Sequence, residues 1–450
     1  MVSTELLLGI DLGTTSSKAA VVDLDGTELA HGRAPTRWRK VPTGGEAHPD
    51  DFVQAAIASA AQALDGAPPG RVTAVGVASM AETGALLDRD GRAVAPSIAW
   101  HDSRGADEAE RLERELGAEH FAAHAGLPPT PLASISKYRW LREHQPDSTS
   151  RGVRWLSVAE YVVRQLGGEE VAELSLASRT GMFDVVERKW WDEALDWAGA
   201  PPGLMPEPRP AGTPAGTVRS DSPVERARGA VLAVGGHDHL SAAVGAGADG
   251  EGDVLDSCGT AEAFVRAVAP LPRERIVEAV ALDVGVGCNV TPGLHALLAS
   301  VRSGAVLSKV LALLGVDPNE RGPLEREALA APADAGGLEL RGVATDELSL
   351  AGIGRDSSPA MAYRAALEAV GAAGAELLDH MASVAGPARR LVTTGGWAEG
   401  EAAMAVKARH LGQFEHAAAV FAGARGAALT AARAAGVDSP ALAGASEGAA

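Results

Sequence analysis

Cysteine is nearly absent from this sequence, in which the only two among 450 residues are Cys258 and Cys288. Two thiols cannot form the disulfide framework of a small secreted domain, and their spacing matches no metal-binding motif. Long apolar runs are missing too, since none reaches the roughly 20 residues that span a bilayer. The start of the chain lacks the basic segment that opens a signal peptide. We therefore expect a reduced, cytoplasmic protein without a membrane partner.

Basic residues are also fewer than acidic residues. The chain has 40 basic and 59 acidic residues, which gives a net charge of −19 and disfavours nucleic acid as a partner. The phosphate-binding pattern GxxxxGK[ST] does not occur, which excludes a P-loop enzyme. The length exceeds that of one ordinary core, so at least two domains are expected. These properties favour a protein that handles small molecules.

The opening stretch, residues 6–26, reads LLLGIDLGTTSSKAAVVDLDG. Two apolar runs flank a turn of small polar residues, which predicts a β-hairpin. Its tip would offer backbone N–H groups, hydroxyls and Lys18 to an anion, while Asp11 would face a cation. This combination suits a nucleotide phosphate tail with Mg²⁺. The alternative is an ordinary tight turn, because glycine, threonine and serine are common turn residues.

The rest of the chain alternates strand and helix patterns. Predicted strands cover 27–35, 72–79, 230–235, 253–257, 261–267 and 390–394. Predicted helices start near residue 50 and cover 103–116, 134–144, 240–247, 305–314 and much of 359–385. The proline-rich segment 201–214 resembles a linker, although the strand after it could return to the first sheet. The two halves repeat one layout of hairpin, strands and helices, which predicts an α/β fold with mixed sheets.

Asp238 lies in the segment Gly-Gly-His-Asp-His, directly after an apolar strand. Open α/β sheets place their chemistry at this end of a strand. The flanking residues His237 and His239 make a weak metal site because no third ligand is in register. Asp238 could cap the next helix, act as a catalytic base, or do both.

Two later segments repeat the hydroxyl-and-glycine chemistry of the first turn. The sequence Ser-Cys-Gly-Thr at 257–260 lies between two predicted strands, and Thr-Gly-Gly-Trp at 394–397 closes another. We interpret Cys258 as a small buried residue because no basic partner is evident nearby. The second segment would let backbone approach a ligand closely, or it is an ordinary turn.

These segments resemble the FGGY family of carbohydrate kinases, within the sugar kinase/Hsp70/actin superfamily. The resemblance extends from residue 6 to about 436 and rests on GIDLGTTSSKAAVVDLDG, VGVASMAETGALLD, PSIAWHDSRG, AVGGHDHLSAAVGAG with DVLDSCGTAEA, and LVTTGGWAEG. It implies two ribonuclease H-like (actin-like ATPase) domains, each a mixed β-sheet flanked by helices, with a cleft between them. Residues 1–237 would bind the sugar and 238–442 the adenine, and 443–450 would form a flexible tail.

The resemblance also implies site residues. Asp238 would be the general base and Asp11 would help to hold Mg²⁺. The ATP contacts would be Gly13, Thr14, Thr15, Ser16 and Lys18 on one side, Gly259 and Thr260 on the other, and Gly304, Gly395 and Gly396 around the nucleotide. The substrate contacts would be Glu82, Trp100, Asp102, Asp238 and His239. The reaction would be ATP-dependent phosphorylation of a hydroxyl group on a small sugar or polyol, a ketose or alditol.

The segment Met80-Ala81-Glu82 departs from the family pattern. Xylulose kinases carry Gln-Met-His there and glycerol kinases Gln-Arg-Glu, so neither standard pocket is present. The alternatives are a non-catalytic sugar or nucleotide sensor with this fold, or an ATPase of the actin type. A homodimer is the default assembly for a soluble enzyme.

Overall fold

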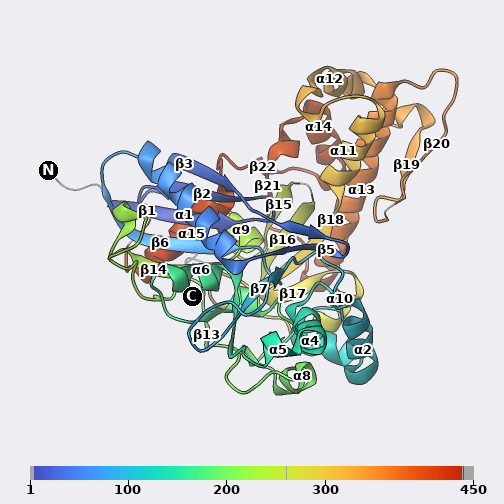
Figure 1. Cartoon of the computed structure of the whole chain (residues 1–450). Helices are drawn as coiled ribbons and strands as arrows, with labels where there is room; N and C mark the ends of the chain where they lie inside the picture. Colours follow the sequence, from blue (N-terminus) through green and yellow to red (C-terminus); the bar gives the residue numbers. More distant parts are fainter. Residues whose placement is uncertain (1–4, 260, 346, 438, 440–450) are drawn as a thin grey trace.

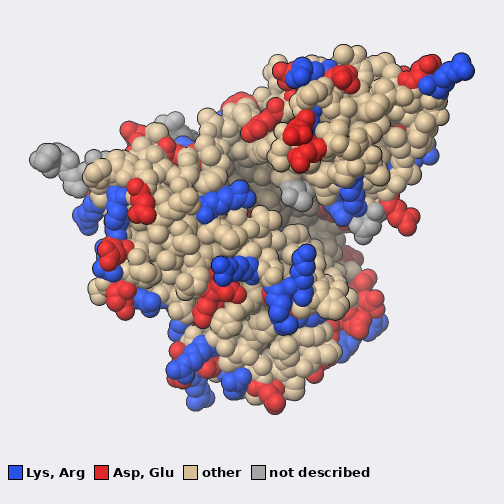
Figure 2. Space-filling view, turned by 45° about the horizontal axis from the view of Figure 1, so that its top comes forward, with Lys and Arg blue, Asp and Glu red and all other residues tan. Residues whose placement is uncertain are grey.

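A computed structural model describes residues 5–259, 261–345, 347–437 and 439 of the chain (Figure 1). Two mixed β-sheets, each covered by helices, form the two halves of the molecule. The space-filling view shows the surface hollowed between the lobe that carries helices α11 to α14 and the rest (Figure 2). Within the described residues, no helix is both long and apolar enough to cross a membrane.

The first sheet has the strand order β14-β6-β1-β2-β3. Its strands are β1 (Glu5–Leu12), β2 (Ser16–Val22), β3 (Glu28–Pro35), β6 (Arg71–Ser79) and β14 (Val231–His237). The first three form an antiparallel meander, while β6 pairs in parallel with both β1 and β14. The hairpin predicted at the start of the chain is therefore confirmed, and the strand at 230–235 does return to this sheet.

Helices cover both faces of the first sheet because successive side chains of a strand alternate between faces. Leu6, Leu8 and Ile10 pack toward α1 (Pro49–Gly66) and α6 (Val158–Leu166). On the opposite face, Leu7 lies in a separate core with small residues of α15. The main apolar core of this half lies between the first sheet and helices α1 and α6.

Helix α15 (Ala422–Ala434) comes from the end of the chain, yet it packs on the first sheet and on α9 (Asp238–Ala246). Two glycines make the contact close: a Cβ built on Gly9 would lie 1.7 Å from the carbonyl oxygen of Ala424, and one on Gly76 would lie 1.9 Å from that of Ala427. The final helix therefore ties the two halves together. The predicted boundary at 237 and 238 falls between β14 and α9 and stays a prediction.

The second sheet has the order β17-β18-β16-β15-β21-β22. Its strands are β15 (Asp253–Cys258), β16 (Glu262–Val268), β17 (Gly285–Cys288), β18 (His295–Val301), β21 (Arg390–Thr394) and β22 (Glu415–His416). Strands β15, β16 and β18 repeat the antiparallel meander of the first sheet, and β21 and β22 add the parallel pair. The repeated layout expected from the sequence is present.

Helices of the second half pack on this sheet and extend beyond it. They are α10 (Arg273–Ala281), α11 (Ser303–Leu313), α12 (Gly322–Ala330), α13 (Pro359–Ala385) and α14 (Glu401–Leu411). The long helix α13 runs from the sheet into the upper lobe, which also carries the hairpin of β19 (Glu339–Arg341) and β20 (Ser349–Ala351) (Figure 1). The predicted tail 443–450 lies outside the described residues.

A third group of elements, between β6 and β14, forms a lobe beside the first sheet with its own apolar core. Its helices are α2 (Ala106–Leu116), α3 (Ala118–Ala125), α4 (Ser134–His144), α5 (Pro146–Thr149), α7 (Leu174–Ala177) and α8 (Asp192–Ala198). Its short strands are β7 (Gly84–Leu87), β8 (Ser97–Ile98), β9 (Arg154–Ser157), β10 (Ala172–Glu173), β11 (Phe183–Asp184), β12 (Lys189–Trp190) and β13 (Pro208–Arg209). Strand β5 (Gly44–Ala47) pairs with β8 on one side and with β4 (Arg39–Val41) on the other. The linker-like segment 201–214 contains β13, which pairs with β10 inside the first half.

Candidate active site

Two tryptophans fix the tip of the first hairpin. The indole of Trp38 donates a hydrogen bond to the carbonyl of Thr14 (2.7 Å), and the indole of Trp100 donates to its hydroxyl (2.8 Å). Among the described residues, the backbone N–H groups of Thr14 and Thr15 have no hydrogen-bond acceptor. A fixed turn that presents unpaired N–H groups is a typical anion-binding arrangement.

The remaining hairpin residues have different surroundings. The Ser16 hydroxyl is buried and accepts a hydrogen bond from Arg33 (3.1 Å), so it supports the hairpin from within. The ammonium group of Lys18 lies 5.6 Å from the centre of the Phe421 ring. Gly13 closes the turn through its N–H, which donates to the carbonyl of Ser16 (3.2 Å).

Asp11 lies near the end of β1, next to this tip. Its Oδ1 atom is enclosed and has no hydrogen-bond partner among the described residues. Burial and the negative charge of Asp238 raise the pKa of Asp11 to about 7, while Lys18 opposes the shift. Helix α15 contacts this carboxylate at Gly423, where a Cβ would lie 2.5 Å from Oδ2. Two neighbouring carboxylates with an unpaired oxygen form a site suited to a cation.

Asp238 is the first residue of α9, directly after the bulge at Gly236 in β14. Its carboxylate Oδ1 accepts a hydrogen bond from the N–H of His239 (2.7 Å) and lies 3.2 Å from Nε2 of His237. Burial lowers the pKa of His237 to about 4, so its ring is neutral at neutral pH. A neutral ring protonated at Nε2 donates to Asp238 and holds the carboxylate in place.

A buried chain of hydrogen-bonded polar groups holds the backbone of His237. Its backbone N–H donates to the Ser175 hydroxyl (2.9 Å), which donates to Glu173 (2.5 Å), and the N–H of Glu173 donates to Glu160 (2.8 Å). Burial raises the pKa of Glu160 to about 8 and that of Glu173 to about 7. The end of β14, which leads directly into Asp238, is therefore held by two carboxyl groups that gain protons on folding.

This network predicts that the protein loses stability between pH 6.5 and 8. When folding raises the pKa of a carboxyl group, its contribution to stability is fully present below the pKa of the unfolded state. That contribution is lost as the pH rises through the pKa of the folded state. For Glu160 the loss between pH 6.5 and 8 is about 1 to 2 kcal/mol. Buried His237 acts in the opposite direction, but only below pH 6.5.

Urea unfolding at pH 6.5, 7.25 and 8 measures this slope. The variant Glu160→Gln should reduce it, whereas Glu110→Gln, at an exposed position of α2, should leave it unchanged. A free energy of unfolding that rises over this range would contradict the prediction.

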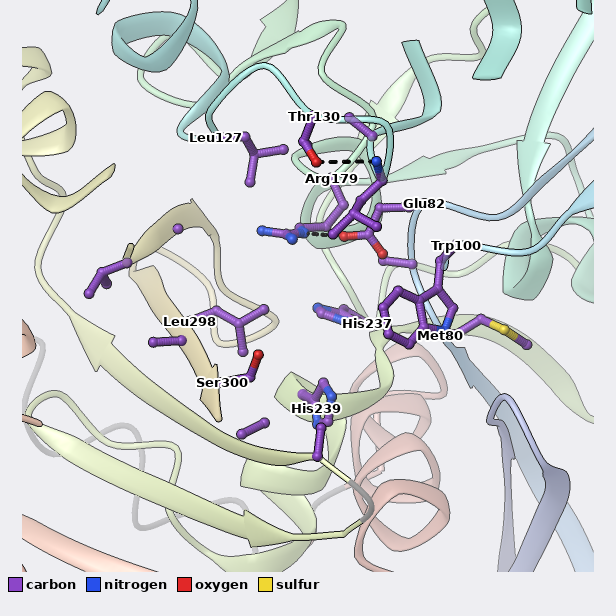
Figure 3. A pocket seen from close by; sticks show the side chains of 18 of the residues that line it. Met80, Glu82, Trp100, Leu127, Thr130, Arg179, His237, His239, Leu298 and Ser300 are labelled. Carbon is purple, nitrogen blue, oxygen red and sulfur yellow. Dashed lines mark hydrogen bonds and ion pairs between the residues drawn. The ribbon is translucent and has the colours of Figure 1, made fainter. Parts of the chain in front are cut away.

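A cavity of about 420 Å³ opens in front of Asp238. It brings together Thr14, Glu82, Trp100, Asp238 and His239, all predicted from the sequence. Residues of the second half complete it, among them Val280 and Asp283. Leu298 and Ser300 belong to the same wall (Figure 3). The phosphate hairpin, the candidate base and the predicted substrate residues thus share one space between the two sheets.

Glu82 takes a left-handed backbone conformation (φ 61°), which is uncommon for a residue other than glycine. The Ser134 hydroxyl donates to its carbonyl (2.9 Å), and its carboxylate pairs with Nε of Arg179 (2.7 Å). Strained backbone of this kind clusters at functional sites. Arg179 follows α7 and is a cavity residue that the sequence did not single out.

Asp102 does not line the cavity, contrary to the expectation. Its carboxylate is fully buried and binds the guanidinium of Arg104 through both oxygens (2.9 Å each) and the N–H of Gly45 (2.9 Å). These bonds lower its pKa against the opposing effect of burial. Asp102 is therefore a structural residue, and its neighbour Trp100 is the one that faces the cavity.

The predicted nucleotide segments meet around a small hollow of about 30 Å³ in the second half. Gly259 and Trp397 line it, and Ser303 does so next to Gly304 at the start of α11. Gly395 has φ 105°, and a Cβ there would lie 2.4 Å from the Cys258 carbonyl, so only glycine fits. Gly396 follows it and begins a short 3₁₀ helix. Thr260 lies outside the described residues.

A buried lysine stands beside this hollow. Lys407 of α14 donates to Asp256 (2.5 Å), Glu262 (2.5 Å) and the sulfur of Cys258 (3.0 Å). Cys258 is buried as expected, but the prediction that it has no basic partner nearby was wrong. Burial raises the pKa of its thiol, and so does Asp256. The three acidic groups have the geometry of a metal site, yet the ammonium group occupies it.

The chain is similar in sequence to known proteins. Residues 6–245 match the model of the FGGY family of carbohydrate kinases, N-terminal domain. A glycerol kinase from Trichlorobacter lovleyi is 31% identical over 419 residues, which are 87% of this chain and 82% of that protein. A gluconokinase from Bacillus subtilis is 30% identical over 201 residues, 44% of this chain and 39% of that protein. The chain matches half or less of the length of the first curated relatives.

A solved structure has the same fold. The xylulose kinase from Rhodospirillum rubrum superposes with a TM-score of 0.85 at 25% identity, covering 95% of this chain and 89% of that one. The predicted fold of two actin-like domains, each with a mixed sheet, is confirmed. The chain belongs to the FGGY family of carbohydrate kinases.

Proposed function

We propose that this protein transfers the γ-phosphate of ATP to a hydroxyl group of a small sugar or polyol. The observation that carries the proposal is the shared cavity, in which Asp238 and the hairpin residue Thr14 face one space. Relatives named gluconokinase, glycerol kinase and xylulose kinase all act on small polyhydroxylated acceptors. A phosphate-binding tip beside a held carboxylate is the arrangement that phosphoryl transfer requires.

In the proposed reaction, Asp238 accepts the proton of the acceptor hydroxyl as its oxygen attacks the γ-phosphorus. The new O–P bond forms while the bond between that phosphorus and the ADP oxygen breaks. The N–H groups of Thr14 and Thr15 and the ammonium of Lys18 would stabilise the phosphate charge from the first half, and Gly259 from the second. Gly304, Gly395 and Gly396 would surround the nucleotide.

The residues present fit a magnesium ion. Asp11 offers an enclosed oxygen without a partner among the described residues, and the charge of Asp238 acts on the same carboxylate. Carboxylate oxygens are the ligands that Mg²⁺ prefers, and the ion supplies neutralisation of phosphate charge when bound. Asp11 would hold it, next to the tip that binds the phosphates.

A substrate panel tests the proposal. ADP release is measured with ATP and Mg²⁺, alone and with ketoses, alditols, aldoses and sugar acids of three to six carbons. Strong stimulation by one acceptor, with an equal amount of its phosphate ester, is the expected result. Hydrolysis that no acceptor stimulates would favour an ATPase of the actin type, and acceptor binding without turnover would favour a sensor. Either outcome would overturn the kinase proposal.

A further inference from the structure

Arg179 places a cation in the part of the cavity beside Glu82, where the sugar or polyol acceptor would bind. Its Nε–H donates to Glu82 Oε1 (2.7 Å), which fixes the plane of the guanidinium. Figure 3 shows the far end of this side chain pointing away from Glu82, into the space between Leu127 and Leu298. A Cβ built on Gly285 would lie 3.0 Å from Nη1, so the backbone of β17 leaves room for the group.

The outer edge of this guanidinium is unpaired. Among the described residues, Nη1 and Nη2 have no hydrogen-bond acceptor, and Glu82 Oε2 has no donor. The side chain of Arg179 is only 17% exposed. A largely enclosed charged group with free donors gains most from an anionic acceptor, and two parallel N–H groups match the two oxygens of a carboxylate.

A second cation lies near Glu82. Lys137, from α4, is buried behind Trp100 and Leu132, where its ammonium donates to the carbonyls of Trp100 (2.9 Å), Pro131 (2.8 Å) and Leu132 (2.6 Å). It makes no ion pair within the described residues. The charges of Glu82 and Asp102 both act on this ammonium group.

The other charges nearby are already balanced. Asp102 and Glu46 bind Arg104, and Arg39 also pairs with Glu46. The cavity wall also carries Asp238, the candidate base, and Asp283, which is exposed on the second half. The unpaired edge of the Arg179 guanidinium, and not the net charge of the cavity, therefore favours an anionic group on the acceptor.

We infer that the acceptor is a sugar acid whose carboxylate binds the free edge of Arg179. The inference rests on the proposed kinase function and narrows its substrate class. Glu82 Oε2 lies beside the same guanidinium, so it can accept the proton of a hydroxyl next to the carboxylate. A 2-hydroxy acid satisfies both groups at once, whereas a neutral polyol leaves the guanidinium edge with weaker acceptors.

The arrangement also predicts which hydroxyl receives the phosphate. Arg179 and His239, the neighbour of Asp238, lie at separate places around the cavity (Figure 3). With the carboxylate at Arg179, the hydroxyl that reaches Asp238 belongs to a carbon remote from the acid group. The product would carry its phosphate near the opposite end of the chain.

Matched acceptors test the inference. The kcat/KM of the wild-type enzyme is measured for aldonates of four to six carbons and for the alditols with the same configuration. We expect the acids to exceed the matched alditols by about 10- to 100-fold, the range of a charge-assisted hydrogen-bonded pair. Phosphorus NMR of the product locates the ester.

Variants separate recognition from folding. Arg179→Gln should lose the preference for the acid mainly through KM, and Arg179→Lys should retain part of it, because a lysine keeps the charge without the fork. Arg151→Gln, on the exposed surface next to α5, should keep the full preference. If Arg179→Gln does not fold, the comparison of acids with alditols in the wild type still decides.

A failure of this inference can be distinguished from a failure of the kinase proposal. Efficient phosphorylation of a ketose or alditol, with the acids inactive, would overturn this inference and leave the kinase proposal intact. The absence of phosphorylation across the whole panel would overturn the kinase proposal itself. An undiminished preference for the acid in Arg179→Gln would show that another group recognises the carboxylate.

Discussion

Replacing Asp238 by asparagine should lower kcat by about 10²- to 10⁴-fold while ATP binding is retained, the range expected for removal of a general base. Asparagine has nearly the same shape and keeps an oxygen that can accept from the N–H of His239 and from Nε2 of His237. It cannot take up the proton of the acceptor hydroxyl. The loss should therefore appear in the chemical step and leave the affinity for ATP close to normal.

Single-turnover kinetics with radiolabelled ATP and calorimetric titration with a non-hydrolysable ATP analogue measure the two quantities separately. Asp221→Asn is the matched control, because it makes the same substitution at an exposed position that does not line the cavity. A variant with near-normal turnover would exclude Asp238 as the base. An unchanged kcat with weaker nucleotide binding would instead assign Asp238 to the nucleotide alone.

The sheets could be predicted from the sequence because their signals are local. Apolar runs separated by a small polar turn defined both hairpins, and the registers from Leu7 to Leu12 and from Val254 to Cys258 follow directly from those turns. The packing of α15 on the first sheet could not be predicted. It depends on close approach at Gly9 and Gly76, more than 300 residues away in the chain.

Some residues of the site could be predicted from the sequence and others could not. Asp238 and Glu82 were found because they lie in recognisable segments, and both line the cavity. Asp102 was placed wrongly because sequence position does not set the direction of a side chain, which Arg104 determines here. Arg179 was missed because its partner, Glu82, is 97 positions away and a lone arginine after a short helix carries no motif.

Replacing Lys407 by methionine should lower the free energy of unfolding by about 3 to 5 kcal/mol, the usual cost of breaking a buried ion pair from one side. The side chains of Asp256 and Glu262 are 0% and 6% exposed, and each lies 2.5 Å from the lysine nitrogen. Methionine fills a similar volume but leaves two carboxylates enclosed without a cation. Lys309→Met, at an exposed position of α11, is the matched control and should change stability little.

The pH dependence of this loss identifies its cause. Burial and the charge of Glu262 already raise the pKa of Asp256 to about 7, against the effect of Lys407. Without the ammonium group the pKa of Asp256 in the folded state rises further, so the folded protein binds a proton that the unfolded chain releases. Stability of the variant then falls as the pH rises, and urea unfolding should show a larger deficit at pH 8 than at pH 5. An equal deficit at both values would mean that Lys407 stabilises the second half by packing its hydrocarbon stem and that its charge contributes little.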